Sequence, residues 1–401
     1  VYRSRRKKLG FRKAIAQNIL EKVFVKGSLQ IVLPDGDSFI LGEPKKGGIV
    51  AHIELKSWRT FHCLFMSGVT GLGEAYMQDF WSSEDLSSLL KFGLSNRDTT
   101  RRLARGRFIQ RIFNRLQHSL RRNSIAGSKK NIAHHYDLGN QFYAHWLDSS
   151  MTYSSALFST QKDNLVDAQE NKYRSLCELI NMASSSSTLE IGCGWGGFIE
   201  HVSKEHGSRI EGITISKEQF QFVKKRIENG EWSSSASVKT LDYRLVRGRY
   251  DKIVSIEMIE AVGERYWHKF FEKLKTLLMP QGSIGLQLIT IDEAAFSLYR
   301  KYPDFIQKYI FPGGMLMTKG LLKELSASAG LQLVEIRDFG SDYARTLRIW
   351  KERFNAAWPE LEKMGFEGRF RKMWNFYLSY CEAGFDDGLI DVSQVHLTHA
   401  G

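Results

Sequence analysis

The second half of this chain alternates short apolar runs with helix-like segments, and this alternation constrains the fold more than any other feature. From about residue 131 the strand candidates are STLEI, RIEGITI, SVKTLDY, DKIVSIEMI, GSIGLQLITI and LQLVEIRDF. Most are separated by amphipathic segments such as KEQFQFVKKRIENG and WHKFFEKLKTLL. Strands that alternate with helices usually pair in parallel, so we expect an α/β fold with a doubly wound, Rossmann-like sheet. The segment DVSQVHLT near the end predicts an antiparallel strand that closes this sheet.

The first hundred residues predict a smaller α/β unit. SLQIVLPDG and GIVAHIELKS alternate as strands do, and Pro-Asp-Gly forms a turn between apolar runs. A helix is expected within AYMQDFWSSEDLSSLLKFGL, with Ser82 or Ser83 as its N-cap. A chain of 401 residues has room for about two domains. We therefore expect an N-terminal domain over residues 1–120 and a catalytic domain over residues 121–401.

The charge balance favours a polyanionic partner. The chain has 57 Lys and Arg against 44 Asp and Glu, a formal net charge of +13, which suits nucleic acid or an anionic membrane surface. Between residues 101 and 122, apolar side chains recur at three- and four-residue spacing while arginines fall largely elsewhere. This pattern predicts a basic amphipathic helix that lies on lipid headgroups, or else a helix between domains with a solvated charged face.

Cysteine usage and apolar runs indicate the cellular setting. Cys63, Cys177, Cys193 and Cys381 are scattered without metal-ligand spacing, so we expect reduced thiols and no metal site. No apolar run approaches the roughly 18 residues that span a bilayer. The basic N-terminal segment lacks a secretory apolar core. We expect a cytoplasmic protein.

A glycine-rich loop, TLEIGCGWGGF at residues 188–198, follows the first strand of the larger unit and opens a helix. No Gly-Lys-Ser/Thr follows, which excludes a P-loop. Gly192, Gly194 and Gly197 satisfy the dinucleotide pattern, but the next strand ends in GITIS without the acidic residue that grips a ribose. Glu190 lies inside the apolar strand, and an acid there before G-x-G-x-G suits S-adenosylmethionine (SAM). The alternative is a tight turn that only packs helix against strand.

Further motifs accompany this loop in a characteristic order: HYDLGNQFY, TYSSALF, LEIGCGWGGF, GITIS, LDYR, KYIFPGG and DYARTLRIW. Together they resemble the cyclopropane fatty acid synthase family, which includes the mycolic acid cyclopropane synthases, over roughly residues 130–399. LPDG and GEAYMQDFW also resemble the N-terminal domain of longer bacterial members. The resemblance implies SAM-dependent methylene transfer to the cis double bond of an unsaturated acyl chain, usually in a membrane phospholipid. The double bond takes the methyl group, a carbocation-like centre forms, and a base removes a proton as the ring closes.

The resemblance also implies a role for individual residues. Gly192 and Gly194 would line the methionine part of SAM, with Tyr153 and Ser154 closing over it. The ribose would contact Thr214, Ser216 and Gln219, and the adenine would lie beside Asp242 and Tyr243. The residues implied in catalysis are Glu260, Tyr343 and Tyr136.

Two acids compete for the main catalytic role. Glu260 in SIEMIEAVG matches the active-site glutamate of the family, so we favour it over Glu257, whose alternative role is a surface or helix-cap charge. A carboxylate just after a buried strand is costly unless it has a partner or a task.

The family usually binds bicarbonate as its base, held by glutamate, histidine, tyrosine and backbone groups. Tyr343 matches the tyrosine, but Ile289 stands at the histidine position, Ser155 at a family cysteine and Ala261 after the glutamate. Losing one donor should weaken a buried anion site by about 1.5–3 kcal/mol. We therefore expect a weakened bicarbonate site, another base, or a methyl- or methylene-branched product in place of the ring.

The resemblance implies a membrane phospholipid with an unsaturated acyl chain as partner, on an anionic membrane surface. We expect a homodimer, peripheral on the inner face of the cell membrane. A nucleic-acid methyltransferase is a weaker alternative because no Asn/Asp-Pro-Pro-aromatic motif occurs. A non-catalytic homologue that binds lipid or SAM is a further alternative.

Overall fold

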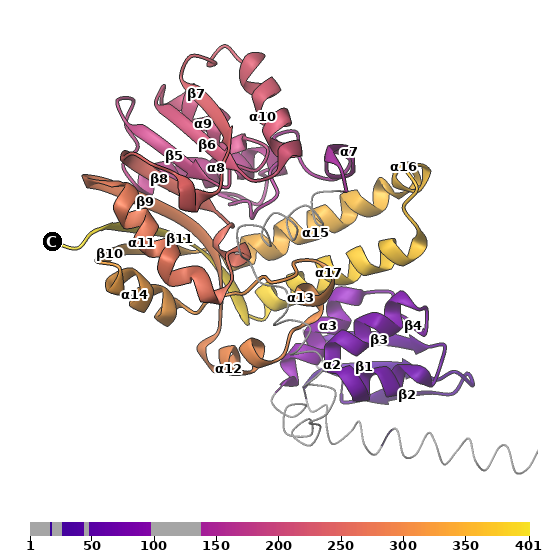
Figure 1. Ribbon diagram of the computed structural model, residues 1–401. Helices are drawn as coiled ribbons and strands as arrows, with labels where there is room; N and C mark the ends of the chain where they lie inside the picture. Colours follow the sequence, from indigo (N-terminus) through magenta and orange to yellow (C-terminus); the bar gives the residue numbers. More distant parts are fainter. Residues whose placement is uncertain (1–16, 18–25, 44–47, 98–137) are drawn as a thin grey trace, which may run out of the picture.

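The structure is a computed structural model that describes residues 17, 26–43, 48–97 and 138–401 (Figure 1). These residues form a four-stranded sheet in the order β2-β1-β3-β4 and a seven-stranded sheet in the order β10-β11-β9-β8-β5-β6-β7. The expected basic helix at 101–122, the domain boundary near 120 and Tyr136 lie outside the described residues. No described helix combines the length and the apolarity needed to cross a membrane.

The seven-stranded sheet confirms the expected α/β fold. Its strands are β5 (Ser187–Ile191), β6 (Arg209–Thr214), β7 (Ala236–Thr240), β8 (Tyr250–Ile256), β9 (Leu278–Ile291), β10 (Leu331–Asp338) and β11 (Ile390–His399). β5 to β9 pair in parallel, and β11 is antiparallel to both β9 and β10. The antiparallel strand was therefore predicted correctly, but it lies between two strands rather than at the edge.

Helices cover both faces of this sheet. Neighbouring residues of a strand point to opposite faces, so they pack against different helices. Ile253 of β8 packs in the core with α11 and α14, and Val254 packs in the core with α8, α9 and α10. These helices are α8 (Leu165–Leu179), α9 (Gly197–Glu205), α10 (Lys217–Glu228), α11 (Trp267–Leu277) and α14 (Lys319–Ser328). Shorter elements are α7 (Asn140–Ala144), η2 (Tyr243–Leu245), η3 (Ile259–Ala261), η4 (Glu264–Tyr266), α12 (Glu293–Lys301) and α13 (Phe305–Tyr309).

The N-terminal unit is the small α/β unit that the sequence predicts. It contains β1 (Ser28–Val32), β2 (Ser38–Leu41), β3 (Val50–Leu55), α2 (Arg59–Met77), β4 (Trp81–Ser82) and α3 (Leu86–Ser95). The expected N-cap was wrong: Asp85 caps α3 by accepting from the backbone N–H of Ser88 at 3.0 Å. Ser82 belongs to β4, and the Ser83 hydroxyl donates to the carbonyl of His52 instead.

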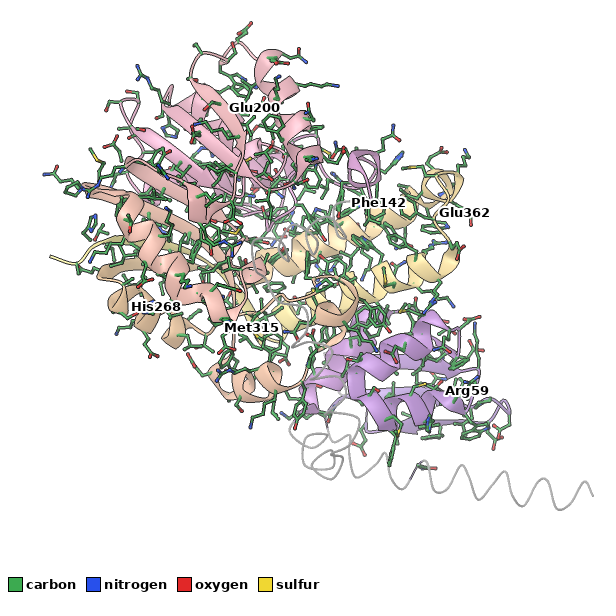
Figure 2. The ribbon with its side chains drawn as sticks, in the orientation of Figure 1. Arg59, Phe142, Glu200, His268, Met315 and Glu362 are labelled. Carbon is green, nitrogen blue, oxygen red and sulfur yellow. The ribbon has the colours of Figure 1, made fainter. Side chains whose placement is uncertain are left out.

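A helical hairpin joins the two sheets. The helices α15 (Gly340–Ala356), α16 (Trp358–Lys363) and α17 (Gly368–Asp386) occur between β10 and β11. The helices α15 and α17 run side by side, and α17 is the one next to the N-terminal unit (Figure 1). Phe142 of α7 packs on this hairpin, with its ring centroid 5.1 Å from that of Trp374 (Figure 2). Gly73 allows α2 to pack closely against α13, since a Cβ at this position would lie 2.6 Å from the ring of Phe305.

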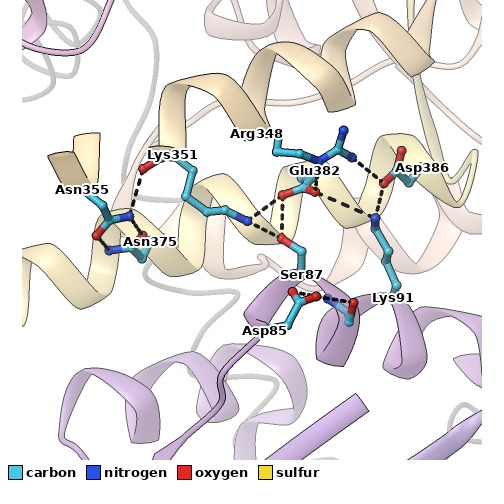
Figure 3. Close-up of polar contacts among 10 residues, drawn as sticks. Asp85, Ser87, Lys91, Arg348, Lys351, Asn355, Asn375, Glu382 and Asp386 are labelled. Carbon is cyan, nitrogen blue, oxygen red and sulfur yellow. Dashed lines mark hydrogen bonds and ion pairs between the residues drawn. The ribbon is translucent and has the colours of Figure 1, made fainter. Parts of the chain in front are cut away.

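A buried carboxylate fastens the hairpin to α3 (Figure 3). Glu382 of α17 accepts from the Ser87 hydroxyl of α3 at 2.5 Å, from Lys351 of α15 at 2.8 Å and from Arg348 at 3.1 Å. Burial pushes the pKa of Glu382 upward, but Lys351, Ser87 and Arg348 outweigh it and hold the pKa below its usual range. The cluster therefore stabilises the contact between the N-terminal unit and the rest of the chain while Glu382 is ionised.

We expect Glu382→Gln to lower the free energy of unfolding by about 1–3 kcal/mol, because it leaves Lys351 and Arg348 without the negative charge that they pair with. The loss should appear in thermal or urea unfolding at neutral pH. It should shrink as pH falls from the pKa of a free glutamate through the lower pKa of Glu382, because the unfolded chain takes up the proton first and the folded protein follows only at lower pH. Glu360→Gln is the control: Glu360 forms an exposed ion pair with Lys363, so its substitution should leave the free energy of unfolding nearly unchanged. Equal effects of the two variants would contradict this role of Glu382.

Candidate active site

One cavity of about 690 Å³ connects the carboxyl ends of β5, β6 and β8 with α2, α13, α15 and α17. One end of the cavity is polar and is formed by the glycine loop and by polar groups at the ends of the strands. The remainder is largely apolar and aromatic, lined by Leu298, Ile306, Phe311, Met315 and Phe385. Met315 lies near the middle of the molecule, where these elements meet (Figure 2). The cavity can thus accommodate a polar and an apolar ligand next to each other.

The glycine loop brings its backbone to the wall of this cavity. Gly192, Gly194 and Gly196 have φ values of 81°, 53° and 82°, a region that favours glycine. A Cβ on Gly192 would lie 2.7 Å from Cγ of Met258, whereas a Cβ on Gly194 would meet no atom within 4 Å. Gly194 therefore faces open space, into which a side chain would project.

The residues implied for the ribose and adenine lie at the next strand ends. Thr214 donates its hydroxyl to Oε1 of Gln219 at 2.8 Å, and both line the cavity. Ser216 instead caps α10 by accepting from the Gln219 backbone N–H at 3.3 Å, and it is absent from the cavity wall. Asp242 and Tyr243 line the cavity beyond β7; Asp242 accepts from Nε of Arg244 at 2.8 Å.

Tyr153 and Ser154 both line the cavity. The hydroxyls of Tyr153 and Tyr377 lie 2.7 Å apart, and Oγ of Ser154 accepts from Nζ of Lys172 at 2.8 Å. Lys172 is fully buried in α8, and burial lowers its pKa to about 7. Burial raises the pKa of nearby Glu190 to about 8. Sequence reasoning missed Lys172, because a lysine on a charged helix usually faces water.

Glu257 proves to be part of the cavity rather than a surface or helix-cap charge. It follows β8 and lines the cavity next to Met258 and Glu260. Oε2 accepts from the Tyr343 hydroxyl at 2.6 Å, and Oε1 accepts from Nε2 of Gln287 and from the Ser155 backbone N–H, each at 2.8 Å. Burial raises the pKa of Glu257, and its hydrogen bonds, led by that of Tyr343, partly offset this.

Glu260 also lines the cavity but has different partners. Oε1 accepts from the Ile289 backbone N–H at 2.6 Å, and Oε2 is buried without a hydrogen-bond partner among the described residues. Burial and the nearby charge of Glu257 raise the pKa of Glu260 to about 8. When two carboxyl groups lie close together, the charge of one disfavours ionisation of the other. The raised pKa of Glu260 favours its protonated form, while the donors around Glu257 favour its ionised form.

The residues do not offer a bicarbonate ion the donors that the resemblance implies. The Tyr343 hydroxyl and the Ser155 backbone N–H are both directed at Glu257. Ile289 contributes only its backbone N–H, which is directed at Glu260.

A potential metal-ligand set lies away from the cavity, although the sequence spacing predicts none. The ligand atoms of Cys177 on α8, His201 on α9 and His206 just after α9 lie within 4.8 Å of one another. Burial lowers the pKa of His201 to about 4. Only the fold brings these three side chains together, so their spacing in the sequence could not reveal them.

The seven-stranded sheet with its reversed strand, and a glycine loop that faces a cavity at the carboxyl end of β5, define a SAM-dependent methyltransferase. The open backbone at Gly194 and the polar groups at Thr214 and Asp242 fit this cofactor. Residues 124–395 match the mycolic acid cyclopropane synthetase family. The chain belongs to this family.

Individual relatives cover most of the chain. It is 34% identical to the tuberculostearic acid methyltransferase UfaA1 of Mycobacterium tuberculosis, over 97% of this chain and 92% of the relative. It is 33% identical to the cyclopropane-fatty-acyl-phospholipid synthase of Escherichia coli K12, over 87% of this chain and 88% of the relative. The cyclopropane synthase MmaA2 of M. tuberculosis has a similar structure, with a TM-score of 0.63 and 28% identity over 67% of this chain and 97% of MmaA2. The mycolic acid cyclopropane synthase CmaA1, solved with SAH and CTAB, gives a TM-score of 0.64 at 27% identity, over the same shares of the two chains.

Proposed function

We propose that this protein transfers a methyl group from SAM to the cis double bond of an unsaturated acyl chain in a membrane phospholipid and converts it into a cyclopropane. The observation that carries this proposal is the single cavity in which the glycine loop adjoins an apolar, aromatic wall. SAM supplies an electrophilic methyl group at the glycine-loop end. The apolar remainder suits an acyl chain and keeps water away from a cationic centre.

Aromatic side chains around the middle of the cavity support this chemistry. The rings of Tyr343 and Phe385 stack with centroids 4.5 Å apart, and Phe311 and Tyr377 meet edge to face at 6.2 Å. All four line the cavity. Their electron-rich faces stabilise a positive charge that develops on the acyl chain. Glu257 and Glu260 lie beside them and carry the groups that can move a proton.

A branched product is the second candidate. The relative covering 97% of this chain is named a tuberculostearic acid methyltransferase, and the one at 33% identity is named a cyclopropane synthase. The same methyl transfer leads to either outcome, depending on which carbon loses the proton. Loss from the new methyl group closes a ring, and loss from a neighbouring chain carbon leaves a branch.

The decisive measurement is mass spectrometry of phospholipids after incubation with SAM and cis-unsaturated phospholipid vesicles. A gain of about 14 mass units, with one SAH released per product, supports the proposed transfer. Fragmentation then distinguishes a ring from a branch. No mass gain with any unsaturated phospholipid would contradict the proposal.

Access from a lipid surface is supported by an apolar rim on α2. Gly68 interrupts α2 with φ 60° and ψ −138°, and Phe65, Met66 and Val69 beside it are exposed while also lining the cavity. An exposed apolar rim of this kind suits contact with acyl chains. We propose that the protein acts as a peripheral membrane protein on the inner face of the cell membrane. Its homodimeric state and its preference for anionic lipid remain predictions from the sequence.

We expect the double variant Phe65→Ser/Val69→Ser to bind phospholipid vesicles about tenfold more weakly, because less apolar surface enters the lipid. SAM affinity should not change. The control is Ile40→Ser/Val334→Ser, which removes exposed apolar side chains that do not line the cavity. Vesicle co-sedimentation measures both; equal weakening by the two double variants would argue against entry at this rim.

A further inference from the structure

The proposed reaction requires a proton acceptor inside the cavity. Methyl transfer to an alkene leaves a cationic carbon, and a neutral product forms only when a C–H bond gives up its proton. The acceptor has to be ionised, partly screened from water and located where the acyl chain reacts. Glu257 meets these conditions through contacts with three other parts of the fold.

The hydrogen bonds around Glu257 all come from donors. The Tyr343 hydroxyl of α15, the Gln287 side-chain amide of β9 and the Ser155 backbone N–H converge on its two oxygens. An ionised carboxylate only accepts hydrogen bonds, so two N–H groups that can only donate, together with a hydroxyl that donates, stabilise the ionised form. The site therefore holds a carboxylate in the cavity wall, ready to accept a proton.

The orientation of the Gln287 side-chain amide is fixed by a second glutamine, Gln394. Its Oε1 accepts from Nε2 of Gln394 on β11 at 3.3 Å, so its Nε2 faces Glu257. Gln394 is held in turn, because its Oε1 accepts from the Ser175 hydroxyl at 2.8 Å and its Nε2 also donates to the Lys172 carbonyl at 2.9 Å. A chain of buried amides thus makes Gln287 a donor toward Glu257.

The backbone of Glu257 has a strained conformation. Its φ is 47°, a left-handed conformation that is uncommon for a residue with a side chain. A glycine would adopt it without strain. Strain of this kind costs about 1–3 kcal/mol and tends to occur at functional sites. The chain accepts this cost at a position where the side chain reaches the cavity.

We propose that the carboxylate of Glu257 is the proton acceptor of the reaction and takes the place that a bound bicarbonate ion would otherwise occupy. The inference rests on the proposed alkene methylation. The methyl carbon leaves the sulfonium, which becomes the neutral thioether SAH, and bonds to one alkene carbon. A C–H bond of the new methyl group then breaks, its electron pair closes the ring, and the proton bonds to Glu257. The same acceptor serves if a neighbouring chain carbon loses the proton.

Two substitutions of Glu257 test the assignment. Glu257→Gln keeps the shape but cannot accept the proton, so turnover should fall about 100-fold or more while SAM affinity stays unchanged. Glu257→Gly relieves the backbone strain and opens the anion position. We expect this variant to fold, to be inactive in carbon dioxide-free buffer, and to regain at least tenfold activity when bicarbonate or formate is added. Asn181→Gly, which relieves a φ of 52° at an exposed position outside the cavity, is the control and should keep wild-type activity.

Binding of ¹³C-labelled bicarbonate, followed by NMR line broadening, gives a readout independent of turnover. The wild type should not bind the ion, and Glu257→Gly should. A wild type that needs bicarbonate for turnover, or a Glu257→Gly variant fully active without it, would overturn the inference while leaving the proposed function intact. An alcohol as the main wild-type product would also overturn it, because Glu257 would then deprotonate water rather than the acyl chain. A wild type that transfers no methyl group to any unsaturated phospholipid would contradict the proposed function itself.

Discussion

Gly194→Val is expected to abolish measurable SAM binding, with a loss of affinity of at least about 100-fold. Gly194 has a φ of 53°, and a Cβ there would enter open space at the polar end of the cavity. A branched side chain would occupy the volume that the methionine part of SAM needs. It would also strain the loop, because a β-branched residue rarely adopts positive φ. Isothermal titration calorimetry with SAM and SAH measures the effect.

The control for this variant is Gly207→Val. Gly207 has a φ of 61° and no atom within 4 Å of its ideal Cβ position, but it lies on an exposed turn after α9. The substitution imposes comparable backbone strain without entering the cavity, so it should lower stability and leave SAM affinity unchanged. A folded Gly194→Val variant with wild-type SAM affinity would show that the cofactor lies elsewhere.

The architecture was largely predictable because strand and helix periodicities are local properties. The strand that becomes β5, the glycine loop and the helix α9 follow one another in the sequence, and each has its own pattern. The position of β11 between β9 and β10 was not predictable. Strand order depends on contacts between segments far apart in the chain, here on α15 to α17 and their packing.

The N-cap of α3 shows a different limit of sequence reasoning. Ser82, Ser83 and Asp85 are all good capping residues, and the choice among them depends on where β4 ends. Once Ser82 pairs with β3, the chain has to turn before the helix begins, which leaves Asp85 as the cap. Tertiary pairing thus decided between candidates that local preference ranks as equals.

Most of the residues that the motifs assigned to the cofactor line the cavity, with Ser216 as the exception; their contacts with SAM stay a prediction. The motifs could not show that Tyr343 contacts Glu257 rather than Glu260. That contact depends on where α15 packs across the sheet. The one sequence signal available was the run Glu257-Met-Ile-Glu260, in which two acids directly follow a buried strand. One of two such acids usually has its pKa raised, and the sequence does not say which.

Tyr343→Phe should lower turnover about 10- to 100-fold without changing SAM affinity, because it removes a hydrogen bond to a charged group. The substitution should also shift the pH dependence of turnover. The charged and titratable groups around Glu257 are Tyr343, Glu260 and Lys172, from α15, η3 and α8. Burial disfavours the charge on Glu257, while the hydrogen bond from the Tyr343 hydroxyl and the charge of Lys172 favour it.

Because Glu257 acts as the ionised base in this mechanism, turnover should fall as pH drops through its raised pKa. Without the Tyr343 hydroxyl the pKa of Glu257 rises further, so the acid limb of the kcat profile should move to higher pH. Tyr250→Phe is the matched control: Tyr250 donates to Glu211 at 3.2 Å outside the cavity, and its loss should leave both turnover and the acid limb unchanged. A Tyr343→Phe variant whose acid limb stays at the wild-type pH would show that Glu257 is not the group that limits turnover in acid, because no other described carboxylate receives that hydroxyl.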